Sequence, residues 1–408
     1  MVGQLLRLRQ VTFVICNHSE TNVRKIADTT VPQSKNMKIL RNNGINMSDE
    51  NIEKFRVLCL DGGGVRGLYS AYFLKNITAL FNCKYNEKNN IEPDIGGQFD
   101  LICGTSTGAI LACALAYGVP ISNIIELYTM YGPLIFKDPK PDRLLKIIAW
   151  TIKYMLKHNA QKDILKTCLM KCFDKCDLEQ LYRQRRIGVC IPCIDASNHK
   201  PVVFKTPHHS KFTRDRNTSI VDACLASAAA PIYFPTHKIE RYENAGIYTD
   251  GGLWANNPML LGLIEAAFLT KFNKEIEIIS VGTSDAPVGT GGKEPHKSGF
   301  WGWQGGIEVG LMAIKAQSQA SSFMTSILSQ SLSAANKRVT IYRFQESERS
   351  PEDCFALGTD KVSEEALICL KRLARKDASH NHSLIESDLQ KAEHSMVKDI
   401  FSNVPPLR

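Results

Sequence analysis

The sequence predicts an α/β fold in which helices cover a mainly parallel central sheet. Residues 55–60 form an apolar, strand-like run that glycines end, and residues 68–81 then show helical periodicity. The same design recurs as a strand over 99–103, a turn over 104–108 and a helix of small residues over 109–117. Two consecutive units of strand, turn and helix indicate parallel strands, because each helix returns the chain to the end of the sheet at which the previous strand began.

Length and composition are those of a folded globular protein. The 408 residues are enough for one large α/β core with appendages or for two modest domains. Hydrophobic residues at 44% and charged residues at 22% exclude wholesale disorder. The net charge of +9 suits an anionic partner, such as a membrane surface or a nucleic acid. No stretch approaches the roughly 20 apolar residues of a spanning helix, so we expect any membrane contact to be peripheral.

The 13 cysteines are expected to be thiols in a reducing cytosol, because their number is odd and no signal peptide is recognisable. Two clusters raise the alternative of a metal site: Cys168, Cys172 and Cys176 at helical spacing, and Cys190 with Cys193 in an apolar run. In a strand, an odd offset points the last two to opposite faces, and no His-x-x-x-His pair follows. We therefore expect buried thiols and no metal.

We divide the chain into three segments. Residues 1–53 are polar and form an N-terminal extension, residues 54–345 form the main domain, and residues 346–408 form a helical C-terminal segment. Residues 133–177, which are helical, basic and apolar, look inserted on this scaffold. Further strands are expected at 188–194, 201–205, 277–282 and 339–344, and further helices at 220–229, 257–271 and 306–333.

The turn over residues 104–108 has the pattern of a nucleophile elbow. It reads Gly104-Thr-Ser-Thr-Gly108 and lies between an apolar strand and a helix, which is the context that such an elbow requires. The sharp turn would expose the hydroxyl of Ser106, and the flanking glycines would remove Cβ atoms that collide with backbone. The helix that follows would direct the positive end of its dipole at an oxyanion.

A second glycine-rich turn, with the sequence Asp-Gly-Gly-Gly-Val-Arg-Gly, follows the first strand at residues 61–67. Its glycine spacing also matches a dinucleotide-binding loop, but residues 82–90 are polar and lack the second strand that such a site needs, and Asp61 would put a carboxylate directly before the first glycine. The alternative is an oxyanion hole formed by the backbone of Gly62, Gly63 and Gly64. Arg66 would then add positive charge or order the loop.

A serine nucleophile needs a base. Asp250 lies on a turn with Gly251 and Gly252 just before a helix, where a carboxylate of raised proton affinity could take the serine proton. An Asx turn or a helix cap is the simpler structural role for this aspartate. The alternative bases of a Ser-His-Asp hydrolase are the late histidines, which all lie in polar or charged surroundings: His296, His380, His382 and His394.

Together these motifs resemble the patatin-like phospholipase family. The glycine-rich loop, the serine elbow and the Asp-Gly-Gly turn occur in that family's order, with similar segments at 226–235 and 256–258. The resemblance covers about residues 55–282 and implies a three-layer α/β/α fold with helical insertions. It also implies a dyad of Ser106 and Asp250 without histidine, metal or cofactor, which cleaves phospholipid acyl esters through an acyl-enzyme. Arg66 matches the family's basic position.

Two segments are candidate membrane contacts. Lys146, Lys153 and Lys157 fall within about 20° of one line on a helix whose remaining surface is mostly apolar. This pattern fits an interfacial helix, but we slightly favour a core helix with one solvent-exposed edge, because a large protein can bury such a helix. Trp301 and Trp303, in a glycine-rich loop, allow the same two interpretations.

The resemblance also implies expectations about partners. Some bacterial members of the family are anti-phage effectors that a cyclic nucleotide activates and that degrade the cell's own membrane. We therefore expect a cytoplasmic protein that meets phospholipids at the inner face of the membrane, with a cyclic nucleotide activator and a homo-oligomer as hypotheses and no nucleic acid polymer as partner. A non-catalytic basic lipid-binding module is the alternative outside enzymes, and its binding would survive loss of Ser106.

Overall fold

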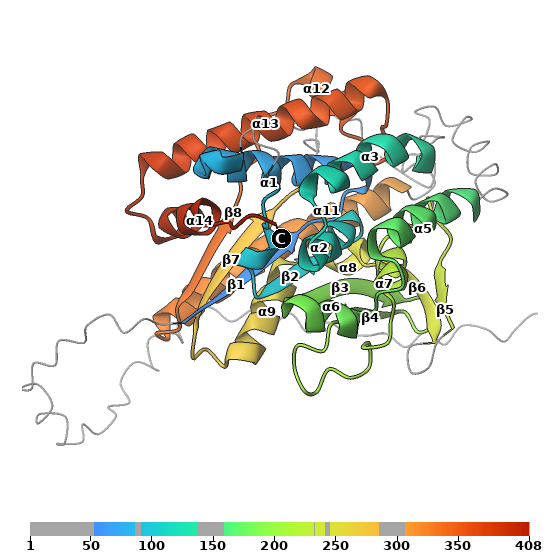
Figure 1. Ribbon diagram of the computed structural model, residues 1–408, viewed down its shortest axis with the longest axis horizontal. Coiled ribbons are helices and arrows are strands. Elements are labelled where there is room, and N and C mark those ends of the chain that lie inside the picture. The colour runs from blue at the N-terminus through green and yellow to red at the C-terminus, as the bar shows by residue number, and fades with distance from the viewer. Residues whose placement is uncertain are drawn as a thin grey trace, which may run out of the picture. The chain divides into compact units, whose positions relative to one another are not determined.

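The computed structural model describes residues 53–85, 91–136, 159–231, 233–240, 245–284 and 307–407 (Figure 1). Residues 52–408 form one compact unit. Three features expected from the sequence lie outside the described residues: nearly all of the N-terminal extension, the lysine-striped helix at 143–157 and the loop with Trp301 and Trp303. Their predicted roles stay predictions.

A mixed, mostly parallel sheet forms the centre of the unit. Its strand order is β5-β6-β3-β2-β1-β7-β8, with β4 paired to β3. The pairs β1–β2, β1–β7, β2–β3 and β7–β8 are parallel. The antiparallel pairs are β3–β4, β3–β6 and β5–β6, on the side of the sheet that includes β3. The strands are β1 (Lys54–Leu60), β2 (Leu101–Gly104), β3 (Gly188–Asp195), β4 (Lys200–Lys205), β5 (His237–Ile239), β6 (Gly246–Asp250), β7 (Glu275–Val281) and β8 (Val339–Arg343).

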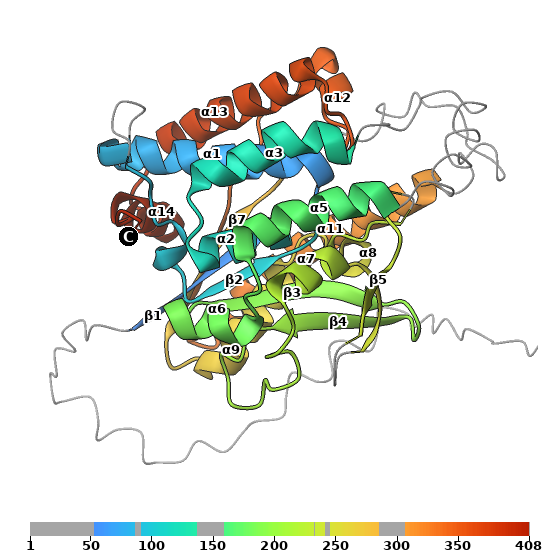
Figure 2. The same ribbon diagram turned by 45° about the vertical axis from the view of Figure 1, so that its right-hand side comes forward.

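Both faces of the sheet are covered by helices, which confirms the predicted three-layer α/β/α fold (Figures 1 and 2). Successive residues of β1 alternate between two apolar clusters, since side chains along a strand point to opposite faces. One face carries α1 (Gly67–Phe81), α2 (Thr107–Tyr117), α3 (Ile121–Ile135), α5 (Asn159–Phe173), α6 (Leu178–Arg185), α7 (Ile220–Ser227), α13 (Glu364–Ser387) and α14 (Ala392–Ser402). The other face carries α9 (Met259–Thr270) and α11 (Ile307–Ala334).

The cysteines of β3 behave as the strand periodicity predicts. Cys190 packs with Cys59 and Cys103 in the cluster under α9, whereas Cys193 packs in the cluster on the opposite face. All the cysteines in the described residues are free thiols. The prediction of buried thiols is thus confirmed for these strands.

The basic segment at residues 133–177 is partly described. Its first residues end α3 at Ile135, and its last third is α5, which packs against α3 and α7. This part of the segment therefore belongs to the helical layer itself rather than to an outlying insertion.

The C-terminal segment is helical in its described residues and belongs to the same compact unit. Beyond the short α12 (Pro351–Ala356), α13 lies along α1 (Figures 1 and 2). Asp377, fully buried on α13, accepts hydrogen bonds from Tyr69 Oη at 2.6 Å and from Arg349 Nη2 at 2.7 Å. Burial alone would raise the pKa of Asp377, but these bonds and those from Ser347 hold it below its usual value.

No helix among the described residues is long and apolar enough to cross a bilayer.

We expect Asp377→Ala to lower the free energy of unfolding at pH 7 by about 3–5 kcal/mol, because it removes the closest anionic partner of the buried Arg349 and leaves only Glu346 at 3.8 Å. Urea denaturation measures this loss. The matched control on the same helix is Glu386→Ala, which removes an exposed ion pair with Lys398 and should cost less than about 1 kcal/mol. Equal losses in the two variants would contradict the assignment of Asp377 as the anchor of α13.

Candidate active site

The carboxyl ends of β2 and β6 meet at one edge of β3. Residues 101–103 of β2 pair with the first residues of β3, and β6 pairs antiparallel with Cys193–Asp195 farther along. Because β4 occupies the other edge of β3 along this stretch, β2 and β6 share one edge and run toward each other. Ser106 follows the end of β2, and Asp250 is the last residue of β6. The sheet topology therefore brings two segments 144 residues apart in sequence together.

Ser106 lies on a strained turn between β2 and α2. Its φ of 55° falls in the left-handed region, which a residue with a side chain rarely adopts. The glycines on either side allow the tight packing of the turn. A Cβ at Gly104 would lie 2.2 Å from the carbonyl oxygen of Gly108, and a Cβ at Gly108 would lie 2.5 Å from that of Leu60. The turn therefore has the geometry of a nucleophile elbow.

The side chains of Ser106 and Asp250 are in direct contact. Ser106 Oγ donates a hydrogen bond of 2.7 Å to Asp250 Oδ2, and the N–H of Gly252 donates one of 2.6 Å to Asp250 Oδ1. Burial raises the pKa of Asp250 to about 6, although both hydrogen bonds favour the ionised form. A carboxylate with this proton affinity can accept a proton at neutral pH and return it within the same cycle.

The aspartate turn is fixed by close packing. A Cβ at Gly251 would lie 2.1 Å from the carbonyl oxygen of Pro192, and one at Gly252 would lie 3.0 Å from Asp250 Oδ1. The first contact is with backbone that cannot move aside, so Gly251 must lack a side chain. Gly252 opens α8 (Gly252–Ala255), and its N–H orients the carboxylate.

Ser227 is a positioning residue that the sequence analysis missed. Its hydroxyl accepts the backbone N–H of Ser106 at 2.9 Å and donates to the carbonyl of Pro192 at 2.6 Å. It therefore links the elbow to β3, the strand that also carries the Asp250 segment. A serine inside an alanine-rich run gives no sequence signal for this role.

The glycine loop lies beside Ser106, but its three amides are not equivalent. A Cβ at Gly62 would lie 3.3 Å from Ser106 Cβ. The N–H of Gly62 donates to the carbonyl of Asn256 at 3.0 Å, so this donor, which the sequence assigned to the oxyanion, is already occupied. In the described part of the chain, the amides of Gly63 and Gly64 donate to no other residue. Gly64 has φ +61°, which explains the need for glycine there.

Arg66 orders the loop from within. It is buried, and its Nε donates to the carbonyl oxygen of Gly63 at 3.2 Å. Of the two roles expected for this residue, the structure shows the ordering contact.

Asp61, which precedes the glycines, is paired with an arginine that the sequence analysis did not single out. Arg343, at the end of β8, contacts the two carboxylate oxygens of Asp61 at 3.2 and 2.6 Å. The buried negative charge at the start of the loop is thereby compensated, so it opposes a negative charge at Ser106 less strongly.

The inner face of α11 supports the segment between the aspartate turn and the glycine loop. Gln317 Oε1 accepts the N–H of Asn256 at 3.0 Å, and Ser321 Oγ donates to the carbonyl of Asn257 at 2.9 Å. Because the carbonyl of Asn256 accepts the N–H of Gly62, Asn256 connects α11 to the glycine loop by hydrogen bonds.

The late histidines in the described residues have other partners or positions. His380 and His382 lie on α13, and His394 on α14 contacts the carbonyl of Asp388 through Nδ1 at 2.9 Å. His296 lies outside the described residues. The hydrogen bond from Ser106 goes to Asp250, which favours the aspartate over a histidine as the base.

One group of potential metal ligands occurs in the described residues: Cys190, His208 and Glu265, with their ligand atoms within 4.8 Å of one another. Lys205 Nζ lies 2.5 Å from Glu265 Oε2, and His208 Nε2 lies 3.1 Å from Oε1. The lysine ammonium already neutralises the carboxylate and would repel a cation. We therefore interpret the group as a buried ion-pair network.

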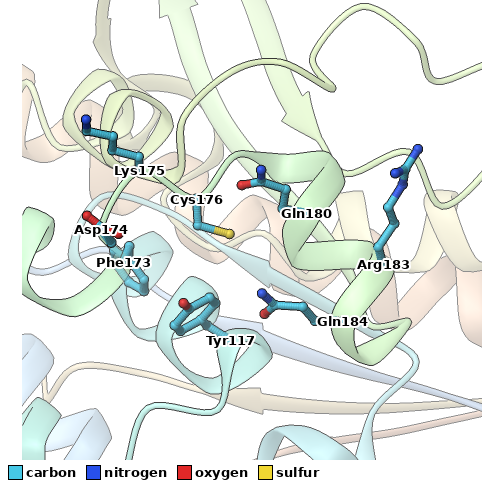
Figure 3. A pocket seen from close by; sticks show the side chains of 8 residues that line it. All are labelled: Tyr117, Phe173, Asp174, Lys175, Cys176, Gln180, Arg183 and Gln184. Atoms are coloured by element: carbon cyan, nitrogen blue, oxygen red, sulfur yellow. The ribbon is translucent and has the colours of Figure 1, made fainter.

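A separate hollow of about 500 Å³ lies between α2, α5 and α6 (Figure 3). Lys175 and Arg183 lie on opposite sides of it, and Tyr117 forms part of its floor. Neither Ser106 nor Asp250 lines this hollow. It is therefore not the place where an ester would react with the serine.

Comparison with known proteins identifies the family. The model of the patatin-like phospholipase family matches residues 58–263, about half of the chain. A cGAMP-activated phospholipase of Pseudomonas aeruginosa is 34% identical over 259 residues, which are 63% of this chain and 70% of the relative. One of Vibrio cholerae is 33% identical over 273 residues, 63% of this chain and 73% of the relative.

A cUMP-AMP-activated phospholipase of Escherichia coli is 29% identical over 240 residues, which are 57% of this chain and 65% of the relative. The family match includes the glycine loop, the elbow and the Asp250 turn. The chain belongs to the patatin-like phospholipase family.

Proposed function

We propose that Ser106 and Asp250 are the catalytic dyad with which this lipid acyl hydrolase cleaves fatty acyl esters of membrane phospholipids. The observation that carries the proposal is the 2.7 Å hydrogen bond from Ser106 Oγ to Asp250 Oδ2 at a strained elbow. Burial supplies the raised proton affinity that a carboxylate needs to act without a histidine.

The reaction follows in two halves. Ser106 Oγ attacks the ester carbonyl while its proton passes to Asp250 Oδ2, and the tetrahedral intermediate then expels the lysophospholipid alkoxide, which takes that proton. Water attacks the acyl-enzyme and gives a proton to Asp250. Collapse of the second intermediate breaks the bond between the acyl carbon and Ser106 Oγ, which recovers the proton as the fatty acid leaves.

The developing oxyanion needs donors other than Gly62. We assign the amides of Gly63 and Gly64, together with the N–H of Thr107. Thr107 is the first residue of α2, and amides in the first turn of a helix have no partner within that helix. In other serine hydrolases the residue after the nucleophile supplies such a donor.

The relatives support a second part of the proposal, a cyclic dinucleotide as activator. These relatives are named as phospholipases that cGAMP or cUMP-AMP activates. We extend this regulation to the present chain, with peripheral contact at the inner face of the membrane as the setting in which it reaches phospholipids. A role in defence against phage is a hypothesis that depends on this activation.

We expect Ser106→Ala and Asp250→Asn each to lower fatty-acid release from phospholipid vesicles by about 10³-fold or more, with or without chelator. Asparagine can still accept the Gly252 N–H and donate to Ser106, so the fold should survive. The matched control is Asp195→Asn. Asp195 lies on the neighbouring strand β3, and its carboxylate accepts a hydrogen bond from Asn198 rather than from Ser106. Full activity in Asp250→Asn would show that another residue is the base.

The pH profile of kcat/KM should follow the protonation of Asp250. Its pKa is raised to about 6, and only the ionised form accepts the serine proton, so activity should fall about tenfold per pH unit below that value. Initial rates with a soluble short-chain ester separate this effect from changes in the membrane. A profile that stays flat down to pH 4 would be incompatible with Asp250 as the base.

Addition of cGAMP or cUMP-AMP should raise phospholipid hydrolysis by the full-length chain at least about tenfold, which corresponds to about 1.4 kcal/mol of activation free energy. Linear dinucleotides provide the control. If neither cyclic compound binds or alters the rate while basal ester hydrolysis persists, the regulatory part of the proposal is wrong and the hydrolase part stands.

A further inference from the structure

The outer face of α11 is an exposed apolar surface. Phe323 is 67% exposed, and Val309, Met312, Met324 and Ile327 are each 47–48% exposed. Five large apolar side chains in contact with solvent on one helix cost free energy, because each leaves apolar surface in water. Such a surface on a folded protein indicates a contact with another body.

Eight of the exposed residues of α11 lie at an alternating spacing of four and three, a series that does not include Met312 and Met324. This spacing is the heptad repeat with which two helices pack side by side. It runs along the whole helix through Val309, Ala313, Ala316, Ala320, Phe323, Ile327, Gln330 and Ala334, all of them exposed. We call these eight residues the α11 seam.

The near absence of charged residues distinguishes the α11 seam from a membrane-binding helix. Between Val309 and Asn336 the sequence contains one charged residue, Lys315. Helices that lie on anionic lipid usually carry rows of Lys and Arg beside the apolar face. In a chain of net charge +9, an uncharged stripe is also the surface on which two copies approach with the least repulsion.

We propose that the α11 seam packs against the same seam of a second copy of this chain, antiparallel, about a two-fold axis between residues 321 and 322. In this register Ala320 faces Phe323, Ala316 faces Ile327, Ala313 faces Gln330 and Val309 faces Ala334. Every layer then contains one alanine and one larger side chain. The two helices can therefore stay at one distance along their length, as close packing requires.

The parallel arrangement fits less well. It would place alanine on alanine at residues 313, 316 and 320 but Phe323 on Phe323, so the helices would diverge from one end to the other. The antiparallel seam is also long enough, because a helix of 28 residues extends about 42 Å.

The pairing would act close to the candidate active site. The inner face of α11 holds Asn256 and Asn257, and Asn256 holds Gly62 of the glycine loop. A partner on the outer face would therefore fix the helix that supports this loop. The inference goes beyond the proposed function, and its test by mass is independent of any hydrolytic activity.

Sedimentation equilibrium of the purified full-length chain should give the mass of a dimer. Phe323→Glu and Ile327→Glu should each raise the dimer dissociation constant at least about thirtyfold, since each buries a charge at the seam. The matched control is Ile368→Glu, which changes a residue 58% exposed on α13 and should leave the dimer intact. Circular dichroism checks the fold. If the wild type has the mass of a monomer, the proposal is overturned, and lipid or another segment of the same chain covers α11 instead.

Ala316→Trp distinguishes a packed seam from a lipid contact. A larger side chain blocks the space for Ile327 and should weaken the dimer, whereas on a lipid surface it would strengthen binding to vesicles of phosphatidylglycerol. Stronger vesicle binding with an unchanged dissociation constant would overturn the proposal.

A short thiol-specific cross-linker tests the register. Only the double variant Ala316→Cys with Ile327→Cys should be linked between chains, because these two positions face each other and the equivalent positions of two copies lie about 16 Å apart. Wild type gives the background from native thiols such as the exposed Cys83. Efficient cross-linking of Ala316→Cys alone would show a parallel pair.

Discussion

The hydrogen bond between Ser106 and a buried aspartate is the constraint on which the site depends. Asp250 is enclosed at the end of a strand, and its burial raises the pKa to about 6. The same burial makes the negative charge costly, so the Gly252 N–H and the Ser106 hydroxyl are needed to hold the ionised form. The raised pKa of Asp250 and its need for these two donors therefore have one physical cause, the burial of the carboxylate.

The sheet supplies the geometry for that bond. β3 pairs with β2 in parallel and then with β6 antiparallel along one edge, so two strand ends point at each other. Ser227 and Gly251 both contact the carbonyl of Pro192 on β3, from the serine side and from the aspartate side. A single strand thus fixes the distance between Ser106 and Asp250, the proposed nucleophile and base. On the far face, α11 supports the glycine loop through Asn256.

Much of this arrangement could be predicted from sequence, because strands such as 55–60 and the glycine turns leave strong local signals. The hydrogen bond that occupies the Gly62 amide could not be predicted, since its acceptor is the carbonyl of Asn256, almost 200 residues away in sequence. Ser227 and Arg343 were missed for the same reason. The short strands β5 and β6 were also missed, because three to five residues near a glycine turn give too little periodicity.

Covalent labelling with a fluorophosphonate at several pH values, followed by peptide mass spectrometry, tests most directly whether Ser106 is activated by Asp250. We expect one adduct, on Ser106, with a labelling rate that falls as Asp250 is protonated below about pH 6. Labelling of a different serine, or a rate on Ser106 that is unchanged in Asp250→Asn, would contradict this expectation.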